Sequence, residues 1–282
     1  MSPEPALKER VRAFWEETPC GTRGVEAEEG SRQFFDRLER ERDRTQPFIA
    51  ECARFAEQRG KRVLEVGIGP ATDFVRFARA GAVLTGVDLT EHAVRLARRR
   101  LELEGLTAEV LQADAESLPF QDGAFDFVYA WGVVHHTQDP GRAVRELVRV
   151  TRPGGEVCAM IYHRHSLVAV QSWIVHALLR GRPRLSFGDV ISRYHESAGT
   201  RAYSIAEARV LFDALEGLSV IPVVTPYDVR LTRSTFAPSW VQALIPRRLG
   251  WFLVVRGRKG EPATGRAGAR PRTSDRGRWW GP

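Results

Sequence analysis

Residues 62–74 read RVLEVGIGPATDF, a short apolar run, a glycine-bearing turn and the beginning of a helical pattern. The run RVLEV has the length and composition of a buried strand. Gly67 and Gly69 then lie in the turn that connects the strand to the helix, where the lack of a side chain lets the backbone pass close to a ligand. This segment therefore predicts a strand–turn–helix unit with a binding site at the turn.

The same alternation of strands and helices continues to Tyr162. Strands separated by helical segments require crossover connections, which indicate a largely parallel sheet covered on both faces. Two further strand patterns near the C-terminus complete a doubly wound, mostly parallel, seven-stranded α/β sheet. The expected strands are 62–66, 82–88, 108–114, 125–130, 156–162, 218–224 and 250–258.

Four parts of the chain differ in pattern. We expect an N-terminal helical cap over 1–60, a cofactor-binding core over 61–162, and a helical substrate-side insertion with the final strands over 163–259. In the insertion, an apolar helix over 166–180 is followed by a loop and then by a helix from Ser204 that ends near Gly217. Residues 260–282 are rich in Gly, Pro and Arg and predict a disordered basic tail.

Composition restricts the class of protein. The chain has 282 residues, 43% of them hydrophobic, which is enough to bury a sizeable core. The net charge of +7 is concentrated at the end, where residues 256–282 hold eight basic and two acidic side chains. Three cysteines without a C-x-x-C pair fit a reducing cytoplasm better than a disulfide framework. We expect neither a signal peptide nor a transmembrane span.

Two carboxylates follow the next strands. Asp88 ends the second strand, where it can accept hydrogen bonds from two ribose hydroxyls. Asp114 ends the third strand, where it can accept from an adenine amino group. A nicotinamide site would prefer a third glycine at position 72, which is Thr72 here. The pattern up to this point fits a nucleotide cofactor.

Five ordered blocks now resemble the class I S-adenosylmethionine-dependent methyltransferases, whose fold is Rossmann-like. These blocks are VLEVGIGPATD, GVDLT, QADAESLPF, FDFVYAWGVVHH and RPGGEV, and the resemblance covers roughly residues 60–165. The most frequent pattern of the family has a third glycine where this chain has Ala71. The resemblance implies S-adenosyl-L-methionine as the cofactor and methyl transfer as the reaction.

The resemblance also implies roles for individual residues. Glu65, Gly67 and Gly69 would line the methionine and ribose side, with Asp73 nearby. Asp88 would bind the ribose and Leu89 would pack on the adenine. The remaining implied positions are Asp114 and Ala115 at the adenine edge, and Trp131 and Gly132 beside the cofactor.

Histidines follow the fourth and fifth strands, at the edge of the sheet where a reaction crevice is expected. We name His135 and His136 as candidate catalytic bases, because imidazole can take a proton from a hydroxyl near neutral pH. Alternatively they only shape the pocket. His163, His165, Tyr194 and His195 form a second candidate group. We expect no metal site, because no clustered carboxylates stand in ligand spacing with the histidines.

The apolar residues of the helix over 166–180 nearly encircle it, so the helix must be covered. Either it is buried against the sheet or a partner subunit, or it forms a lid that covers a hydrophobic substrate and dips into a membrane surface. Peripheral membrane contact is therefore an open alternative, and the oligomeric state is not defined by the sequence.

We interpret the chain as a methyltransferase that acts on a small-molecule acceptor, with O-methylation of a secondary metabolite, lipid or glycan precursor. One alternative is an RNA methyltransferase that uses the basic tail with Trp279 and Trp280. Nucleic acid is the less favoured partner, because the folded part is nearly neutral. The other alternative is a cofactor-binding protein without turnover.

Overall fold

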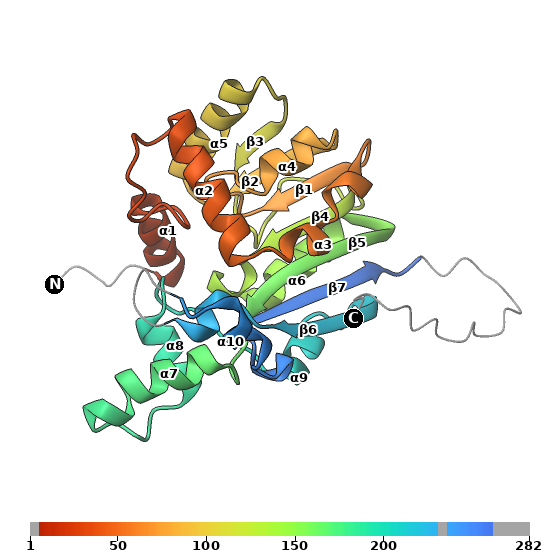
Figure 1. The fold of residues 1–282 in the computed structure, drawn as a ribbon. Coiled ribbons are helices and arrows are strands. Elements are labelled where there is room, and N and C mark those ends of the chain that lie inside the picture. The colour runs from red at the N-terminus through yellow and green to blue at the C-terminus, as the bar shows by residue number, and fades with distance from the viewer. Residues whose placement is uncertain (1–5, 231–235, 262–282) are drawn as a thin grey trace, which may run out of the picture.

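The structure is a computed structural model that describes residues 6–230 and 236–261. Its centre is a seven-stranded sheet with the order β3-β2-β1-β4-β5-β7-β6 (Figure 1). Neighbouring strands are parallel from β3 to β5, whereas β7 is antiparallel to both β5 and β6. This arrangement confirms the predicted sheet. The strands are β1 Arg62–Val66, β2 Val83–Asp88, β3 Glu109–Gln112, β4 Phe125–Trp131, β5 Thr151–Tyr162, β6 Leu215–Val223 and β7 Phe252–Lys259.

Helices cover both faces of the sheet because successive strand residues point to opposite sides. Val63 packs in one hydrophobic cluster with residues of α3, α4 and α5, whereas Leu64 packs in another with α6 and α9. The α-helices are α1 Leu7–Glu17, α2 Arg32–Thr45, α3 Ile49–Ala53, α4 Phe74–Arg79, α5 Glu91–Glu104, α6 Pro140–Val150, α7 Leu167–His176, α8 Phe187–Tyr194, α9 Ile205–Leu211 and α10 Ser239–Ala243; the 3-10 helices are η1 Phe55–Gln58, η2 Val134–His136, η3 Leu178–Arg180, η4 Pro226–Val229 and η5 Arg247–Leu249.

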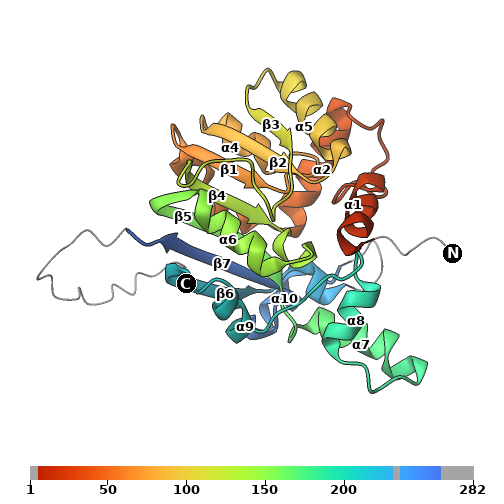
Figure 2. The same cartoon turned by 180° about the vertical axis from the view of Figure 1, so that it is seen from behind.

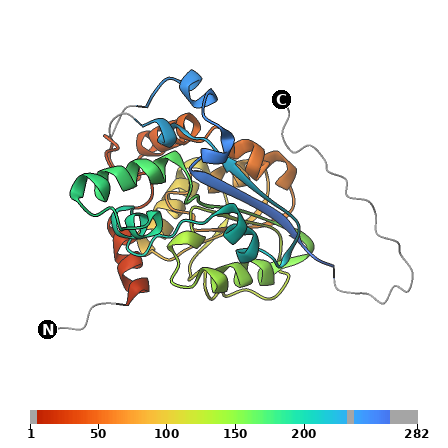
Figure 3. The ribbon, with the colours of Figure 1, turned by 90° about the horizontal axis from the view of Figure 1, so that it is seen from below.

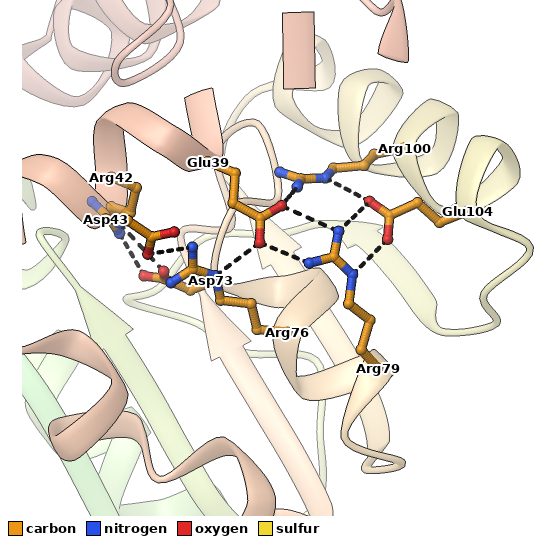
Figure 4. A network of polar contacts seen from close by, with 8 residues as sticks. All are labelled: Glu39, Arg42, Asp43, Asp73, Arg76, Arg79, Arg100 and Glu104. Atoms are coloured by element: carbon orange, nitrogen blue, oxygen red, sulfur yellow. Dashed lines mark hydrogen bonds and ion pairs between the residues drawn. The ribbon is translucent and has the colours of Figure 1, made fainter. Parts of the chain in front are cut away.

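The N-terminal helices are fixed to the core by charged side chains. Glu39 of α2 accepts hydrogen bonds from Arg76 and Arg79 of α4 and from Arg100 of α5 (Figure 4). Arg100 is almost completely buried and also contacts Glu104. Removal of one partner from such a buried ion pair strongly destabilises the folded protein, because the other charge is then left buried without a partner. The network therefore holds α2 in a defined place beside the sheet.

The segment after β5 differs from expectation in three places. The helix that starts at Ser204 ends at Leu211, so Gly217 lies inside β6, where the pairing with β7 shifts register. A helix, α8, occupies part of the expected loop, because Ser186 and Asp189 form a capping box at its start. The predicted helix over 166–180 is divided into α7 and η3.

Helices α7 and α8 form a hairpin that projects away from the sheet, as the front, back and bottom views show (Figures 1–3). Trp173 donates a hydrogen bond to the carbonyl of Leu185 and its ring lies edge-on to Phe187. His176 stacks on Tyr194 at 4.4 Å. These contacts hold the two helices against each other. No helix among the residues described here combines the length and the apolar run that a bilayer crossing requires.

The basic residues near the C-terminus do not all belong to a tail. Arg256, Arg258 and Lys259 lie in β7, where Arg256 pairs with Glu156 and Lys259 donates to the carbonyls of Arg149 and Thr151. The tail expected over 260–282 lies outside the described residues from position 262 onward.

Candidate active site

A cavity of about 1200 Å³ opens at the carboxyl ends of β1, β2, β4 and β5. In parallel α/β sheets this edge is where ligands bind. Helices α1 and α2 contribute the opposite wall with Val11, Trp15, Leu38 and Arg42, and the start of α7 closes one end. The volume exceeds that of most pockets for a single small molecule, so the cavity has room for two reactants.

The turn after β1 forms one wall of the cavity. Gly67 has a φ of +76°, and a Cβ added there would clash with Cγ2 of Val133. Gly69 has a φ of +50°, and a Cβ added there would meet nothing. Ala71 has a φ of +62°, a conformation that costs a non-glycine residue about 1–2 kcal/mol. Ala71 thus keeps the backbone conformation that glycine would adopt at this position.

Asp88 lies at the end of β2 and is held from three sides. Its Oδ2 accepts a hydrogen bond from the N–H of Gly69 at 3.0 Å, and its Oδ1 accepts from the N–H and the hydroxyl of Thr90 at 3.0 and 2.8 Å. Burial raises the pKa of this carboxyl, although these hydrogen bonds oppose the shift. The carboxylate lines the cavity in a fixed orientation, with lone pairs left for a ligand.

Asp114 is the second predicted carboxylate, and Lys8 of α1 contacts it. Nζ of Lys8 lies 2.6 Å from Oδ2 of Asp114 and 2.9 Å from Oε2 of Glu116. The N–H of Glu116 donates to Oδ1 of Asp114. Leu89 and Ala115 line the same region of the cavity. The predicted adenine end is therefore brought together and is covered by the N-terminal helix.

Glu65 is buried at the cavity wall, and its Oε2 has no hydrogen-bond partner among the described residues. Burial raises the pKa of this carboxyl well above its ordinary value. A buried carboxylate without a partner is costly unless a ligand supplies one. A cationic group of a ligand would satisfy Glu65.

Asp73 and Trp131 also line the cavity, but their polar atoms are already paired. Asp73 accepts from Arg42 at 2.5 Å and from the hydroxyl of Tyr129 at 3.1 Å. The indole N–H of Trp131 donates to Gln46 at 2.8 Å. Arg42 lies in α2 and Gln46 at its end, so these contacts fix the cap to the side of the cavity formed by the ends of β1 and β4.

His136 lines the cavity, whereas His135 is not among the lining residues. His135 is fully buried, neither ring nitrogen has a partner among the described residues, and burial holds its pKa well below its ordinary value. His136 has Nε2 at 3.1 Å from Oε2 of Glu196, and Nδ1 at 2.9 Å from the hydroxyl of Ser197. Only His136 is therefore placed to meet a ligand.

Glu196 was not among the predicted catalytic residues, but it lies at the centre of this polar cluster. Its Oε2 also accepts a hydrogen bond from the hydroxyl of Tyr162 at 2.8 Å. Burial opposes its charge, but the contacts with His136 and Tyr162 outweigh this and lower the pKa. Its side chain is 36% exposed and lines the cavity. Within the described part of the chain, all its hydrogen bonds go to Oε2, which leaves Oε1 for a ligand.

The second candidate group is spread out. His195 lines the cavity and contacts the hydroxyl of Ser172 at 2.7 Å. His163 is buried and bonds to the carbonyl of Gly250, His165 is exposed, and Tyr194 stacks inside the hairpin. Glu196 stands next to His195 in RYHES, and this proximity was the one signal in the sequence that could have identified it.

His135, His136 and Glu196 also offer ligand atoms within 4.8 Å of one another, a grouping that could hold a metal ion. His136 and Glu196 are already hydrogen-bonded to each other in this arrangement. A hydrogen-bonded pair of His136 and Glu196 that transfers or orients a proton explains the same geometry. Activity measured after metal ions are removed with a chelator distinguishes a metal site from such a pair.

Comparison with known families agrees with this arrangement. A family model described as a methyltransferase domain matches residues 64–159, which include the glycine turn, Asp88, Asp114 and both histidines of η2. Over these residues the chain thus matches a methyltransferase domain.

Curated relatives resemble part of the chain. A phosphatidylethanolamine N-methyltransferase of Cereibacter sphaeroides is 42% identical over 101 residues, which cover 35% of this chain and 49% of the relative. A ubiquinone biosynthesis O-methyltransferase of Ralstonia nicotianae is 34% identical over 128 residues, covering 43% and 54%. The chain therefore spans about half the length of these curated relatives.

The fold extends the similarity over more of the chain. The structure of a SAM-dependent methyltransferase of Thermotoga maritima, described as a possible histamine N-methyltransferase, superposes with a TM-score of 0.51. It covers 88% of this chain and 99% of the other, at 20% identity. At this identity the similarity concerns the fold alone.

Proposed function

We propose that this chain transfers the methyl group of S-adenosylmethionine to a hydroxyl group of a small, largely apolar acceptor. The observation that carries the proposal is that one cavity contains both the glycine turn with Asp88 and the cluster of His136, Tyr162 and Glu196. The cofactor supplies a methyl group activated for direct transfer to a nucleophile. The protein residues then have to bind both reactants, orient them and manage one proton.

The described residues fit the cofactor. Open space over Gly69 admits a ligand close to the backbone, and the unpartnered carboxylate oxygen of Glu65 suits the ammonium group of its methionine part. Asp88 has acceptor capacity for ribose hydroxyls. Asp114 and Ala115, beside Leu89, would hold the adenine, and Trp131 with Gly132 would lie next to the methionine part.

The cluster at the other side of the cavity would bind the acceptor. Oε1 of Glu196 can accept a hydrogen bond from the acceptor hydroxyl, while His136 and Tyr162 fix the position of this carboxylate. The proton released by the hydroxyl would pass to the pair of Glu196 and His136. Val168, Trp251 and Phe252 supply the apolar lining around the cluster.

A small acceptor is favoured over nucleic acid because α1 and α2 cover the cavity. The relatives named for phosphatidylethanolamine and for ubiquinone biosynthesis support an acceptor with a large apolar part, of the lipid or quinone type. The three free cysteines support a reducing cytoplasm as the working compartment.

The direct test is incubation of the purified protein with methyl-labelled S-adenosylmethionine and a fractionated extract of the native cell. We expect label in small, extractable molecules and no loss after chelation of metal ions. Label in RNA would support the nucleic-acid alternative. Binding of S-adenosylhomocysteine without labelled product would support a cofactor-binding protein without turnover.

A further inference from the structure

The α7–α8 hairpin carries large apolar side chains that the described residues leave partly or largely exposed. Five of them lie in α7 and η3: Val170, Ile174, Val175, Leu178 and Leu179. Leu179 is 74% exposed and Leu178 is 48% exposed, although the aromatic side chains of the hairpin pack inward. Exposed apolar side chains that follow one another along a projecting element mark an interaction surface, unlike single exposed ones.

The connection between α7 and α8 is basic, with Arg180, Arg182 and Arg184, whereas Arg193 lies in the last turn of α8. Between Leu167 and Tyr194 the sequence holds Arg180, Arg182, Arg184 and Arg193, against Asp189 as the only acidic residue. All four arginines are exposed, and none forms an ion pair with another described residue. The carboxylate of Asp189 is engaged by the N–H and hydroxyl of Ser186. The uncovered apolar surface is thus flanked by positive charge that the hairpin does not neutralise.

An apolar surface beside arginines is complementary to the surface of an anionic bilayer, where apolar side chains enter the boundary region and cations contact the headgroups. A second copy of the chain that docked on this surface with its own hairpin would bring arginines against arginines. Charge therefore favours the lipid surface.

The hairpin is continuous with the cavity. The first turns of α7 place Val168, Gln171 and Ser172 in the cavity wall, and Gln171 donates to the carbonyl of Asp228 at 3.2 Å. The exposed leucines follow at the far end of the same helical segment. A bilayer that contacts Leu178 and Leu179 would therefore lie on the side of the molecule where α7 bounds the cavity.

We propose that the α7–α8 hairpin docks this protein on anionic lipid membranes, with the leucines of η3 inserted and the arginines on the headgroups. Docking would bring the cavity near amphiphilic molecules dissolved in the bilayer. The docking step does not depend on the proposed methyl transfer, because it uses neither the cofactor turn nor the polar cluster.

The test is co-sedimentation of the full chain with vesicles of phosphatidylcholine alone or with phosphatidylglycerol added. We expect binding about tenfold stronger to the anionic vesicles, and weaker binding at high salt. The double variant Leu178→Asp/Leu179→Asp should lose about tenfold or more in affinity for vesicles, because two leucine side chains are no longer transferred from water into the bilayer. Arg182→Glu/Arg184→Glu should lose a similar factor, on anionic vesicles only.

Matched controls lie on α9. The exposed fraction of Val210, 72%, is similar to that of Leu179, and Arg209 is an exposed arginine. Val210→Asp and Arg209→Glu should therefore bind vesicles like the unmodified chain. Circular dichroism and S-adenosylhomocysteine binding would check that every variant is folded. Equal vesicle binding by the hairpin variants would place the contact elsewhere, such as residues 262–282, and would overturn the proposal. So would self-association through Leu178 and Leu179 without vesicle binding.

Discussion

The ammonium group of Lys8 in α1 lies 2.6 Å from a carboxylate oxygen of Asp114, directly after β3. One residue thus joins the N-terminal helix to the carboxylate proposed to hold the adenine. Glu16, at the other end of α1, accepts hydrogen bonds from the N–H groups of Glu91 and His92 at the start of α5. Helix α1 is therefore attached at both ends to elements that border the cavity.

Loss of the Lys8 contact should loosen α1 without unfolding the protein. In Lys8→Ala we expect faster deuterium exchange over residues 7–17 and a small change in the free energy of unfolding, about 0–1 kcal/mol, because the pair is partly exposed. Exchange mass spectrometry measures this. Arg12→Ala, an exposed change in the same helix, is the control. Unchanged exchange in Lys8→Ala would show that Lys8 does not hold the helix.

The two glycines of the turn should respond differently to alanine. Gly67→Ala brings a methyl group against Val133 at positive φ, so we expect a loss of about 2–4 kcal/mol in the free energy of unfolding. Gly69→Ala has open space and should lose only about 1–2 kcal/mol. The new methyl group would project into the space proposed for the cofactor, so S-adenosylhomocysteine affinity should fall about tenfold or more. Denaturation and calorimetry together separate these effects. Equal losses in the free energy of unfolding of Gly67→Ala and Gly69→Ala would contradict this prediction.

Proton management by the polar cluster predicts a pH signature. His136→Ala should reduce turnover about a hundredfold or more, and the loss should become smaller at high pH, where the acceptor ionises unaided. Glu196→Gln should show the same trend with cofactor affinity preserved. His165→Ala, an exposed histidine outside the cavity lining, is the control. A pH-independent loss would mean that His136 only shapes the pocket.

His92 should make the attachment of the cap pH-dependent. Burial opposes its charge, but hydrogen bonds to the carbonyl of Glu16 and the carboxylate of Glu29, both at 2.8 Å, raise its pKa above 6.5. A raised pKa in the folded state means that the stabilisation is fully present below pH 6.5 and is lost as the pH rises through the folded-state value. Thermal unfolding between pH 5.5 and 8.5 should therefore show a difference between wild type and His92→Ala that shrinks with rising pH. A constant difference would refute this.

Much of the fold could be predicted because its signals are local. The strand patterns around Val63 and Val128 depend on neighbours in the sequence. Asp88 and Asp114 could be placed at the cavity because the ends of parallel strands meet at one edge of a sheet. The roles of these residues toward a cofactor stay predictions.

The cluster proposed to bind the acceptor depends on contacts between distant segments and could not be predicted in the same way. His135 and His136 are adjacent in η2, and only the packed structure shows which of them reaches the cavity. Glu196 contacts His136 from a loop with a φ of +49°, for which the sequence RYHES gave no conformational signal. In α7, Trp173 packs inside the hairpin and Ile174 is exposed, so neither lines the cavity.

The contact between Lys8 and Asp114 spans 106 residues and has a consequence for biosynthesis. Helix α1 leaves the ribosome long before the strand end on which it docks, and contacts between distant residues form late because loop closure must precede them. The cap should therefore join after the central strands have paired. The enclosed cavity is then a product of the last folding step, and a nascent chain would not trap cofactor before its sheet is complete.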